Sequence, residues 1–474
     1  MADKGRTNQF DDIITKAPEP KPGPLALTGL FSVSLGCVVG SGLVTLIGPA
    51  MAYTGYSVWL AYLVAILMGV VMTFPIVVAS SCVRVGGAFY SLASDILGPR
   101  FGGVIVYATF FTPVLYSGFC QALGMYLNRI FPMFTGQQYT IACIIILLII
   151  NLFGLKLFDR ISKTMATALL VTMLLYIIWG LFHINQPLFD FSGENMFAGG
   201  GLGFVRAVLL LVTSCQAYYT TIYYGKDAQN ATRDIPKAML LTLPCIIFIY
   251  CGLAMVSSGV LPYEEVSGAS TILPAAQHLL PKVLYILFFI GGPLMAILTT
   301  LNPMFNNLRY GFEQATIDGW FPKVLMRHNR YGMPWIIYLV YAAILLIPNL
   351  LGLNIVMITN IYQFLSYFTY MTVIFCAFRI PTRYPDAFKR NLFHLSKPAM
   401  YVICALSAIA YTVVFIKAAI KISPICLLIA VIFIAVVILA SNYLIKNKKL
   451  HIVTSVWPSP DPAQEAAAEN AESC

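Results

Sequence analysis

The chain has 474 residues, of which 59% are hydrophobic and only 10% are charged, whereas globular domains carry about 25% charged residues. This composition excludes a soluble fold and predicts an integral membrane protein whose apolar residues face lipid or one another. The net charge of +10 does not predict a nucleic-acid partner, because the Lys and Arg residues lie in short segments between apolar runs and form no continuous basic face.

Apolar runs long enough to cross a bilayer follow one another along most of the chain. A helix needs about 20 apolar residues to span the hydrocarbon core. By this rule we place about twelve transmembrane helices, at residues 26–53, 58–82, 101–131, 138–153, 162–184, 202–228, 236–260, 282–315, 334–351, 354–379, 398–418 and 421–445. The polar tail over 1–25 shows no cleavable signal peptide. The tail over 446–474, rich in Ala, Glu and Pro, is expected to be disordered.

The distribution of positive charge predicts how the chain lies in the membrane. Twelve spans place both tails on one side. If that side is the cytoplasm, the outer segments hold few of the 29 Lys and Arg residues, namely Arg129, Arg206, Lys282, Lys417 and Lys421. This positive-inside asymmetry predicts a multi-pass protein of the cell (plasma or inner) membrane with both tails cytoplasmic.

Two of the predicted helices are interrupted by small and polar residues in mid-membrane. Residues 35–43 of the first read Leu-Gly-Cys-Val-Val-Gly-Ser-Gly-Leu, with Gly48 and Pro49 one to two turns later. Residues 213–221 of the sixth read Thr-Ser-Cys-Gln-Ala-Tyr-Tyr-Thr-Thr. The two helices lie five spans apart, and interruptions at corresponding positions of two halves indicate the binding site of a secondary transporter.

An unwound turn at these positions would expose backbone groups to a ligand. Glycine lets the backbone unwind and lets a ligand approach closely. The freed N–H groups of the outer half-helix favour a carboxylate, and the freed carbonyls of the inner half suit an ammonium group or a cation. A Gly-x-Gly sequence can instead mark close helix packing, and this alternative stays open. The candidate substrate-binding residues of the two interruptions are Gly36, Cys37, Val39, Gly40, Ser41, Gly42, Ser214, Cys215, Gln216, Ala217, Tyr218 and Tyr219.

The shortage of charge inside the membrane constrains the ligand. Buried charged side chains are costly and, where present, functional, yet apart from residues near span ends, such as Arg206 and Glu313, the predicted transport core contains none. We therefore expect a net neutral, amino-acid-like solute. Tyr116 in the third helix and Tyr362 in the tenth are further pocket candidates, together with Tyr367. Tyrosine rings can also hold a cation, which keeps an organic monoamine open.

The sequence indicates no metal centre, cofactor or catalytic cluster. The 11 cysteines show no metal-type spacing, and the 5 histidines lie in or beside loops. Thr299 and Thr300 in the eighth helix are candidates for a sodium site, although paired Thr in a transmembrane helix more often bonds to its own backbone. We expect no cofactor and no enzyme activity, and no filter-like loop or ring of acids supports a channel.

Four short motifs stand beside the predicted helices. They are Val39-Gly40-Ser41-Gly42-Leu43 in the first, Gly86-Gly87-Ala88-Phe89-Tyr90 with Leu97-Gly98-Pro99 after the second, Asn230 with Arg233, Ile235 and Pro236 after the sixth, and Asp318-Gly319-Trp320-Phe321-Pro322 after the eighth. In this order they resemble motifs of the amino acid–polyamine–organocation transporters, and the resemblance runs from about residue 25 to residue 335. The first is similar to the Gly-rich triplet that holds the substrate carboxylate in that family, and the arginine/agmatine antiporters carry nearly the same stretch.

The resemblance implies an all-α, leucine-transporter-like fold. A transport core over 26–379 would contain two inverted repeats of five helices, 26–184 and 202–379, and two further helices would follow over 398–445. The substrate would lie in mid-membrane between helices 1 and 6, walled by helices 3, 8 and 10, and would move by alternating access.

The sequence also departs from the family pattern. Leu169 stands where many amino acid members have a lysine linked to proton coupling, which weakens the case for such coupling. Residues 217–219 read Ala-Tyr-Tyr where the family usually has Gly and an aromatic residue, and Gln229 and Ala231 replace a Lys and a Pro. These departures indicate a divergent branch.

Together these features predict a secondary active transporter, an exchanger or a symporter, for a neutral amino acid or a close derivative. Two alternatives stay open: a transporter of an organic monoamine or polyamine-type cation, and a nutrient sensor that keeps the fold but transports little. Exchange or uniport without sodium is our preferred mode.

Overall fold

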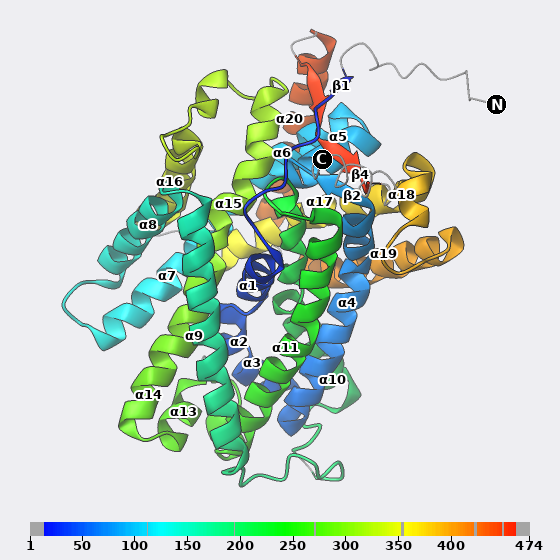
Figure 1. Cartoon of the computed structure of the whole chain (residues 1–474). Coiled ribbons are helices and arrows are strands. Elements are labelled where there is room, and N and C mark those ends of the chain that lie inside the picture. The colour runs from blue at the N-terminus through cyan, green and yellow to red at the C-terminus, as the bar shows by residue number, and fades with distance from the viewer. Residues whose placement is uncertain are drawn as a thin grey trace, which may run out of the picture.

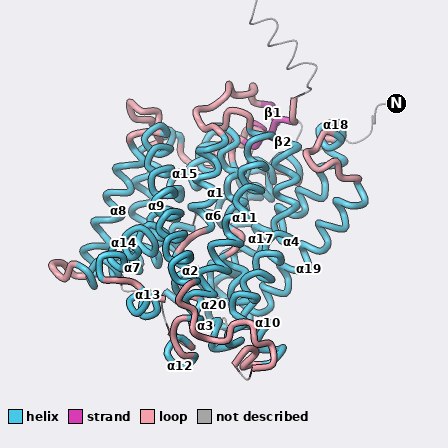
Figure 2. The backbone as a smooth tube through the Cα atoms, turned by 60° about the horizontal axis from the view of Figure 1, so that its bottom comes forward, coloured by secondary structure: helices cyan, strands magenta, loops and turns pink. Residues whose placement is uncertain are grey.

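The computed structural model describes residues 14–110, 112–193, 195–269, 272–351, 355–420, 424–447 and 450–460. In this part of the chain the structure is a bundle of long helices that run side by side (Figure 1). Loops gather at the two ends of the bundle, and short strands lie at the end that carries the termini (Figure 2). We call this end the terminus-bearing side.

The first half of the chain folds into helices with these bounds: α1 Leu27–Val38, α2 Ser41–Thr45, α3 Ile47–Thr54, α4 Val58–Cys82, α5 Ala88–Ile96, α6 Pro99–Phe110, α7 Thr112–Ile130, α8 Gly136–Leu152, α9 Leu155–Leu181 and α10 Gly200–Leu211. The short 3₁₀ turns η2 (Gly55–Ser57) and η3 (Val212–Ser214) follow α3 and α10, and a longer 3₁₀ helix, η4, spans Ala217–Lys226.

The second half continues with α11 Ala231–Gly259, α12 Tyr263–Val266, α13 Leu273–Leu279, α14 Lys282–Phe289, the π-helical turn η5 Ile290–Leu294, α15 Met295–Ile317, the 3₁₀ turn η6 Lys323–Met326, α16 Trp335–Leu350, α17 Ile355–Arg383, α18 Pro385–Lys389, α19 Lys397–Ile420 and α20 Pro424–Lys446. Each predicted span coincides with one helix or with one run of consecutive helices.

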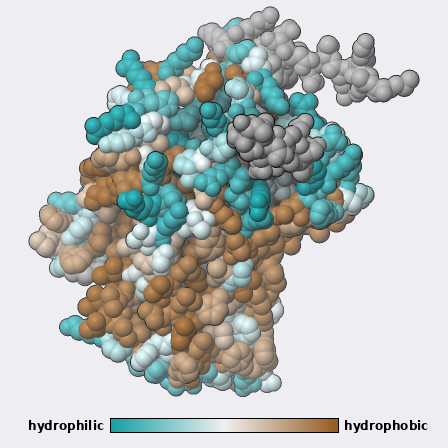
Figure 3. Space-filling view, in the orientation of Figure 1, coloured by the Kyte–Doolittle hydropathy of each residue, from teal (hydrophilic) through white to brown (hydrophobic). Residues whose placement is uncertain are grey.

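The helices make the chain a multi-pass membrane protein. Seven helices or helix runs among the described residues are long and apolar enough to cross a bilayer, and four shorter apolar helices, such as α1 and α8, accompany them. On the face shown in Figure 3, hydrophobic residues form a broad band, whereas hydrophilic residues gather at the terminus-bearing side. Solvation by lipid therefore explains the composition, as the sequence predicts.

Several helices extend beyond the predicted apolar spans. Helix α9 begins at Leu155, seven residues before the predicted start, and includes Lys156, Asp159 and Arg160. Hydropathy marks only the part of a helix in lipid, whereas backbone hydrogen bonding continues until a residue stops it. Here the stop is Gly154, whose φ of +97° suits glycine.

The centre of the bundle is formed by the interrupted first helix. Every residue of α1 from Val33 to Val38 is buried. This helix packs against α9, α11, α15 and η4, so the backbone break that follows it lies inside protein rather than against lipid, as a break at this depth requires.

Two small sheets join the tails to the bundle. Strand β1 (Ile14–Lys16) pairs in parallel with β3 (Ile452–Thr454), and β2 (Val83–Val85) pairs antiparallel with β4 (Val456–Pro458). The expectation of disorder over 446–474 is wrong for residues 450–460, because that expectation averaged an apolar, β-branched segment with the Ala- and Glu-rich residues behind it. Residues 461–474 lie outside the described part.

Candidate functional site

The first break lies between α1 and α2. The helical hydrogen bonding of α1 ends at Val39, and Gly40 is extended, with φ −118° and ψ −165°, before Ser41 starts α2. The Val38 carbonyl accepts from the N–H of Gly40 at 2.9 Å. The break lies within the predicted interruption over residues 35–43. The side chain of Ser41, a candidate ligand, lies outside the described part.

Glycines at this break allow close contact with neighbouring helices. A Cβ atom on Gly40 would lie 2.7 Å from Thr300 Oγ1, and one on Gly42 would lie 2.8 Å from the Cβ of Ser214. On Gly36 it would lie 3.1 Å from the carbonyl oxygen of Thr299. Close helix packing, the alternative interpretation of the Gly-x-Gly sequence, is thus part of the role of these glycines. Gly42 brings the first break directly against the second.

The second break lies between α10 and η4. Helix α10 ends at Leu211, the turn η3 follows, and Cys215 and Gln216 separate it from a 3₁₀ helix of 10 residues. The thiol of Cys215 donates to the Leu211 carbonyl at 3.3 Å. Gln216 is buried, and its Oε1 has no hydrogen-bond partner among the described residues.

One tyrosine hydroxyl contacts the carbonyls of both breaks. Tyr250 in α11 is fully buried, and its Oη lies 2.7 Å from the Val38 oxygen and 3.0 Å from the Ser214 oxygen. Its ring meets that of Tyr62 edge-on at 5.3 Å. The sequence analysis missed Tyr250, because a single Tyr in an apolar helix carries no signal of its partners.

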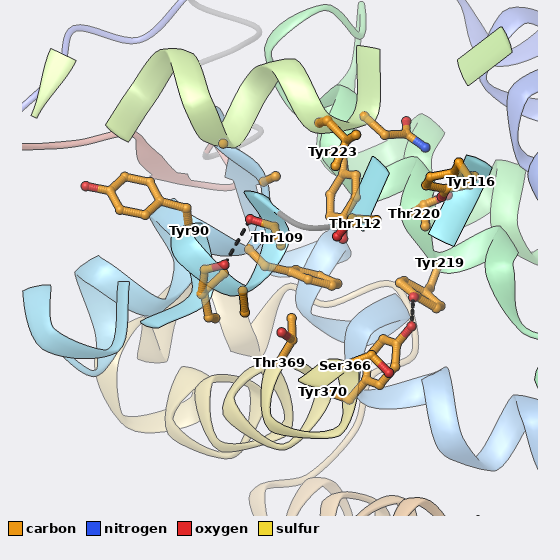
Figure 4. Close-up of a pocket in the computed structure, with 17 residues that line it drawn as sticks. Tyr90, Thr109, Thr112, Tyr116, Tyr219, Thr220, Tyr223, Ser366, Thr369 and Tyr370 are labelled. Atoms are coloured by element: carbon orange, nitrogen blue, oxygen red, sulfur yellow. Dashed lines mark hydrogen bonds between the residues drawn. The ribbon is translucent and has the colours of Figure 1, made fainter. Parts of the chain in front are cut away.

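A cavity of about 70 Å³ lies beside these breaks, between α5, α6, α7, η4, α15 and α17 (Figure 4). Its polar lining consists mainly of hydroxyl groups, from Tyr90, Thr109, Thr112, Tyr116, Tyr219, Thr220, Tyr223, Ser366, Thr369 and Tyr370, with the amide of Asn307. None of its lining residues, all in the described part, is charged. Such a wall can hydrogen-bond a neutral polar ligand but cannot neutralise a net charge.

A hydrogen bond links Tyr219 and Tyr370 in the lining of this cavity (Figure 4), and a smaller cavity adjoins it at Tyr370. The smaller cavity, of about 50 Å³, is lined by Thr213, Gln216, Ser366, Tyr367, Tyr370, Tyr411, Val414 and Phe415. Ser366 and Tyr370 line both cavities, so the two cavities are neighbours.

The predicted site residues are only partly brought together. Tyr116 and Tyr219 line the larger cavity, and Cys37 borders it through a 3.8 Å contact with Asn307. Gln216 lines the smaller cavity, whereas Tyr218 lines neither cavity, and its hydroxyl lies 2.6 Å from that of Thr73.

The remaining candidates stand apart from the cavities. The side chain of Tyr362 lies outside the described part. Neither cavity is lined by the following candidates: Gly36, Val39, Gly40, Gly42, Ser214, Cys215 and Ala217.

The two sodium-site candidates have hydrogen-bonded hydroxyls. Thr299 Oγ1 donates to the carbonyls of Met295 and Ala296 at 2.8 and 3.1 Å. Thr300 Oγ1 lies 3.0 Å from the Ala296 oxygen and 3.3 Å from that of Gly36. The hydroxyl of Thr299 therefore bonds the backbone of its own helix, whereas the hydroxyl of Thr300 also links α15 to α1.

Several lining residues escaped the sequence analysis, although a signal was present. Thr109, Thr112 and Tyr116 follow one another at spacings of three and four residues, and Thr369 and Tyr370 stand three and four residues after Ser366. Such spacing places polar groups on one helix face. A search for polar stripes along the third and tenth helices would have found both walls.

A buried ion pair corrects the expectation of a core without charge. Arg309 in α15 is 4% exposed, and its Nη2 lies 2.7 Å from Asp227 Oδ2 at the end of η4. Tyr310 donates to the same oxygen at 2.6 Å. The pair ties α15 to η4 outside both cavities, so it constrains the helices rather than the ligand.

Glu313, four residues after Arg309 in α15, contacts the loop that follows this helix. His328 Nε2 lies 3.6 Å from its carboxylate. The hydrogen bond that His328 donates to this carboxylate raises the pKa of His328.

Comparison with known proteins gives a consistent result. The sequence profile of a family described as "Amino acid permease" matches residues 25–457. Three similar proteins come from Bacillus subtilis (strain 168). They are "Uncharacterized amino acid permease YvbW" (23% identical, covering 68% of this chain and 75% of that protein), the branched-chain amino acid permease BcaP (21%, 70% and 76%) and the serine/threonine exchanger SteT (22%, 75% and 83%).

Proposed function

We propose that this chain, which belongs to the amino acid permease family, is a secondary active transporter that moves a neutral amino acid or a close derivative by alternating access. Membership of the family makes the chain an amino acid permease and not an enzyme. The identity of the solute and the transport mode are the parts that we propose.

The uncharged, hydroxyl-lined cavity is the observation that carries the proposal. A dibasic amino acid or a polyamine entering it would bring a net charge, and no lining side chain would neutralise that charge. A zwitterion has no net charge for the wall to neutralise, and its ammonium and carboxylate groups can hydrogen-bond the hydroxyls that line the cavity. Serine, threonine and branched-chain amino acids, which appear in the names of two relatives, are net neutral.

We propose further that the helices form two inverted repeats of five, with α19 and α20 added, and that the terminus-bearing side is cytoplasmic. The two backbone breaks, five predicted spans apart, support the repeat. The excess of Lys and Arg on the terminus-bearing side supports the orientation.

Exchange or uniport without sodium is the proposed mode. Leu169 is fully buried in α9, where a coupling lysine would be expected from the family resemblance. The hydroxyls of Thr299 and Thr300 already bond backbone carbonyls.

A monoamine is the second candidate, because five tyrosine rings line the larger cavity and could hold an ammonium group. A thermal-shift screen of purified protein against amino acids and their decarboxylated amines separates the two, because a ligand of the folded state raises the melting temperature. Stabilisation by serine or leucine but not by their amines supports the proposal, and the reverse pattern refutes it. Flux of the stabilising ligand into proteoliposomes then distinguishes a transporter from a sensor.

A further inference from the structure

The two tails of the chain form one hydrogen-bonded unit. In the parallel pair of β1 and β3, Thr15 stands opposite Val453. Ala17 extends the pair, because its N–H donates to the Thr454 carbonyl at 2.9 Å and its own carbonyl accepts from Trp457 Nε1 at 3.0 Å. We call residues 14–17 and 452–458 the terminal clip. Figure 1 shows its strands together at the terminus-bearing side, beside α5.

The clip is anchored on the segment that forms one wall of the larger cavity. Besides the pairing of β4 with β2, the Ser455 carbonyl accepts from the N–H of Gly86 at 2.7 Å, and its hydroxyl bonds Ser91 at 2.7 Å. The buried ring of Trp457 lies so close to Gly86 that a Cβ atom there would be 2.8 Å from it. The residues that accept these contacts lie directly before α5 and within it, and residues 88–90 of α5 line the cavity.

One carboxylate joins the clip to the cavity wall itself. Oδ1 of Asp318 accepts from the Val453 N–H at 3.0 Å and from Gln314 at 3.1 Å. Its Oδ2 accepts from the hydroxyl of Tyr90, which lines the cavity. Asp318 therefore connects β3 to Tyr90 through a single residue.

The N-terminal arm carries the connection across to the opposite wall. Buried Arg84 donates to the carbonyl of Pro20 at 2.8 Å and to that of Gly225 at 2.7 Å, so it ties the arm to the end of η4. The N–H of Leu25 bonds the Asp227 carbonyl at 2.9 Å, just before α1 begins. Residues of η4 line the other side of the cavity.

We propose that the terminal clip is a latch that holds the larger cavity closed toward the terminus-bearing side, and that opening to that side requires the clip to release. This inference rests on the proposed alternating access. The clip bridges α5, α15, η4 and the arm into α1, which are the elements that must separate to admit a solute from that side. Its strands are only three residues long, so release need not unfold the bundle.

The test measures access to the cavity and needs no substrate. Thr109→Cys, on the cavity wall, reports labelling by a membrane-impermeant maleimide applied from the terminus-bearing side of vesicles, with the unsubstituted protein as background. Trp457→Ala removes a clip anchor and should raise the labelling rate severalfold. Trp335→Ala, which removes an equally large ring with 37% exposure outside the clip, should leave the rate unchanged.

A second variant works in the opposite direction and does not depend on how Trp457→Ala folds. When Thr15→Cys and Val453→Cys are joined by a disulfide, the maleimide should label Thr109→Cys more slowly than it does in the same protein after reduction. Equal rates in both redox states, or a folded Trp457→Ala that exposes its tail to protease without faster labelling, would overturn the latch. If the protein transports no amino acid, the proposed function is refuted, but the labelling rates still test the latch.

Discussion

Replacement of Tyr250 by Phe tests whether the two helix breaks act as one unit. The substitution deletes one hydroxyl and keeps a ring of nearly the same volume. That hydroxyl contacts the Val38 and Ser214 carbonyls at 2.7 and 3.0 Å. Because the Val38 oxygen keeps the N–H of Gly40 as a partner, the principal loss falls on Ser214. A buried acceptor without a partner costs about 1–3 kcal/mol.

The cost should lower both stability and affinity. Breaks that are no longer held together populate the binding-competent arrangement less, and the apparent affinity falls by that fraction. A loss of about 1–3 kcal/mol corresponds to binding roughly fivefold to 150-fold weaker. Maximal exchange rate should change less, because Tyr250 lines neither cavity. The measurements are the melting temperature and the concentration dependence of uptake, with the amino acid that the thermal-shift screen identifies.

Tyr62 supplies a matched control. Its ring is equally buried and touches that of Tyr250, but its hydroxyl has no hydrogen-bond partner among the described residues. Tyr62→Phe should therefore leave the melting temperature unchanged or raise it. If both variants behave like the unsubstituted protein, the hydroxyl of Tyr250 does not hold the breaks, and the reasoning above is refuted.

Three further predictions follow from the site. Gly42→Leu should abolish ligand-induced stabilisation while folded protein remains in the membrane; retained uptake would remove this break from the site. Replacing sodium by potassium should leave uptake in proteoliposomes unchanged, since Thr299 and Thr300 bond carbonyls, and a sodium requirement would contradict this. Because Glu313 raises the pKa of His328 above its usual 6.5, their contact should stabilise fully below that pH and be lost as pH rises through the raised value. Melting temperatures between about pH 5 and 8 should show this dependence, and His328→Gln should remove it.

The helix breaks could be predicted from sequence because their signal is local. Gly40 and Gly42 in an apolar run are unusual by themselves, and the matching polar stretch around Ser214 adds an independent clue. The observed breaks follow Val38 and Ser214. Local composition was sufficient because a break needs only residues that weaken the helix.

The cavity walls could not be predicted in the same way, because a hydroxyl in a helix has two uses that look alike in sequence. Thr109 lines the cavity, yet its Oγ1 bonds the Ile105 carbonyl of its own helix at 2.9 Å. Thr299 makes the same kind of bond and lines neither cavity. Only the positions of the neighbouring helices separate these cases.

The buried charge of Arg309 shows how far such arguments extend. From the sequence, a shortage of charged residues in the membrane predicts a neutral ligand. That reasoning requires only that the cavity wall carries no charged residue; charged residues elsewhere in the core do not affect it. Arg309 is paired with Asp227 and lines neither cavity, so its guanidinium group is not part of the wall that a ligand meets. The ion pair instead joins η4 to α15, the two elements that the arm and Asp318 also connect to the terminal clip. The charged residues of the terminus-bearing side thus bear on when the cavity opens, whereas the uncharged wall bears on what it accepts.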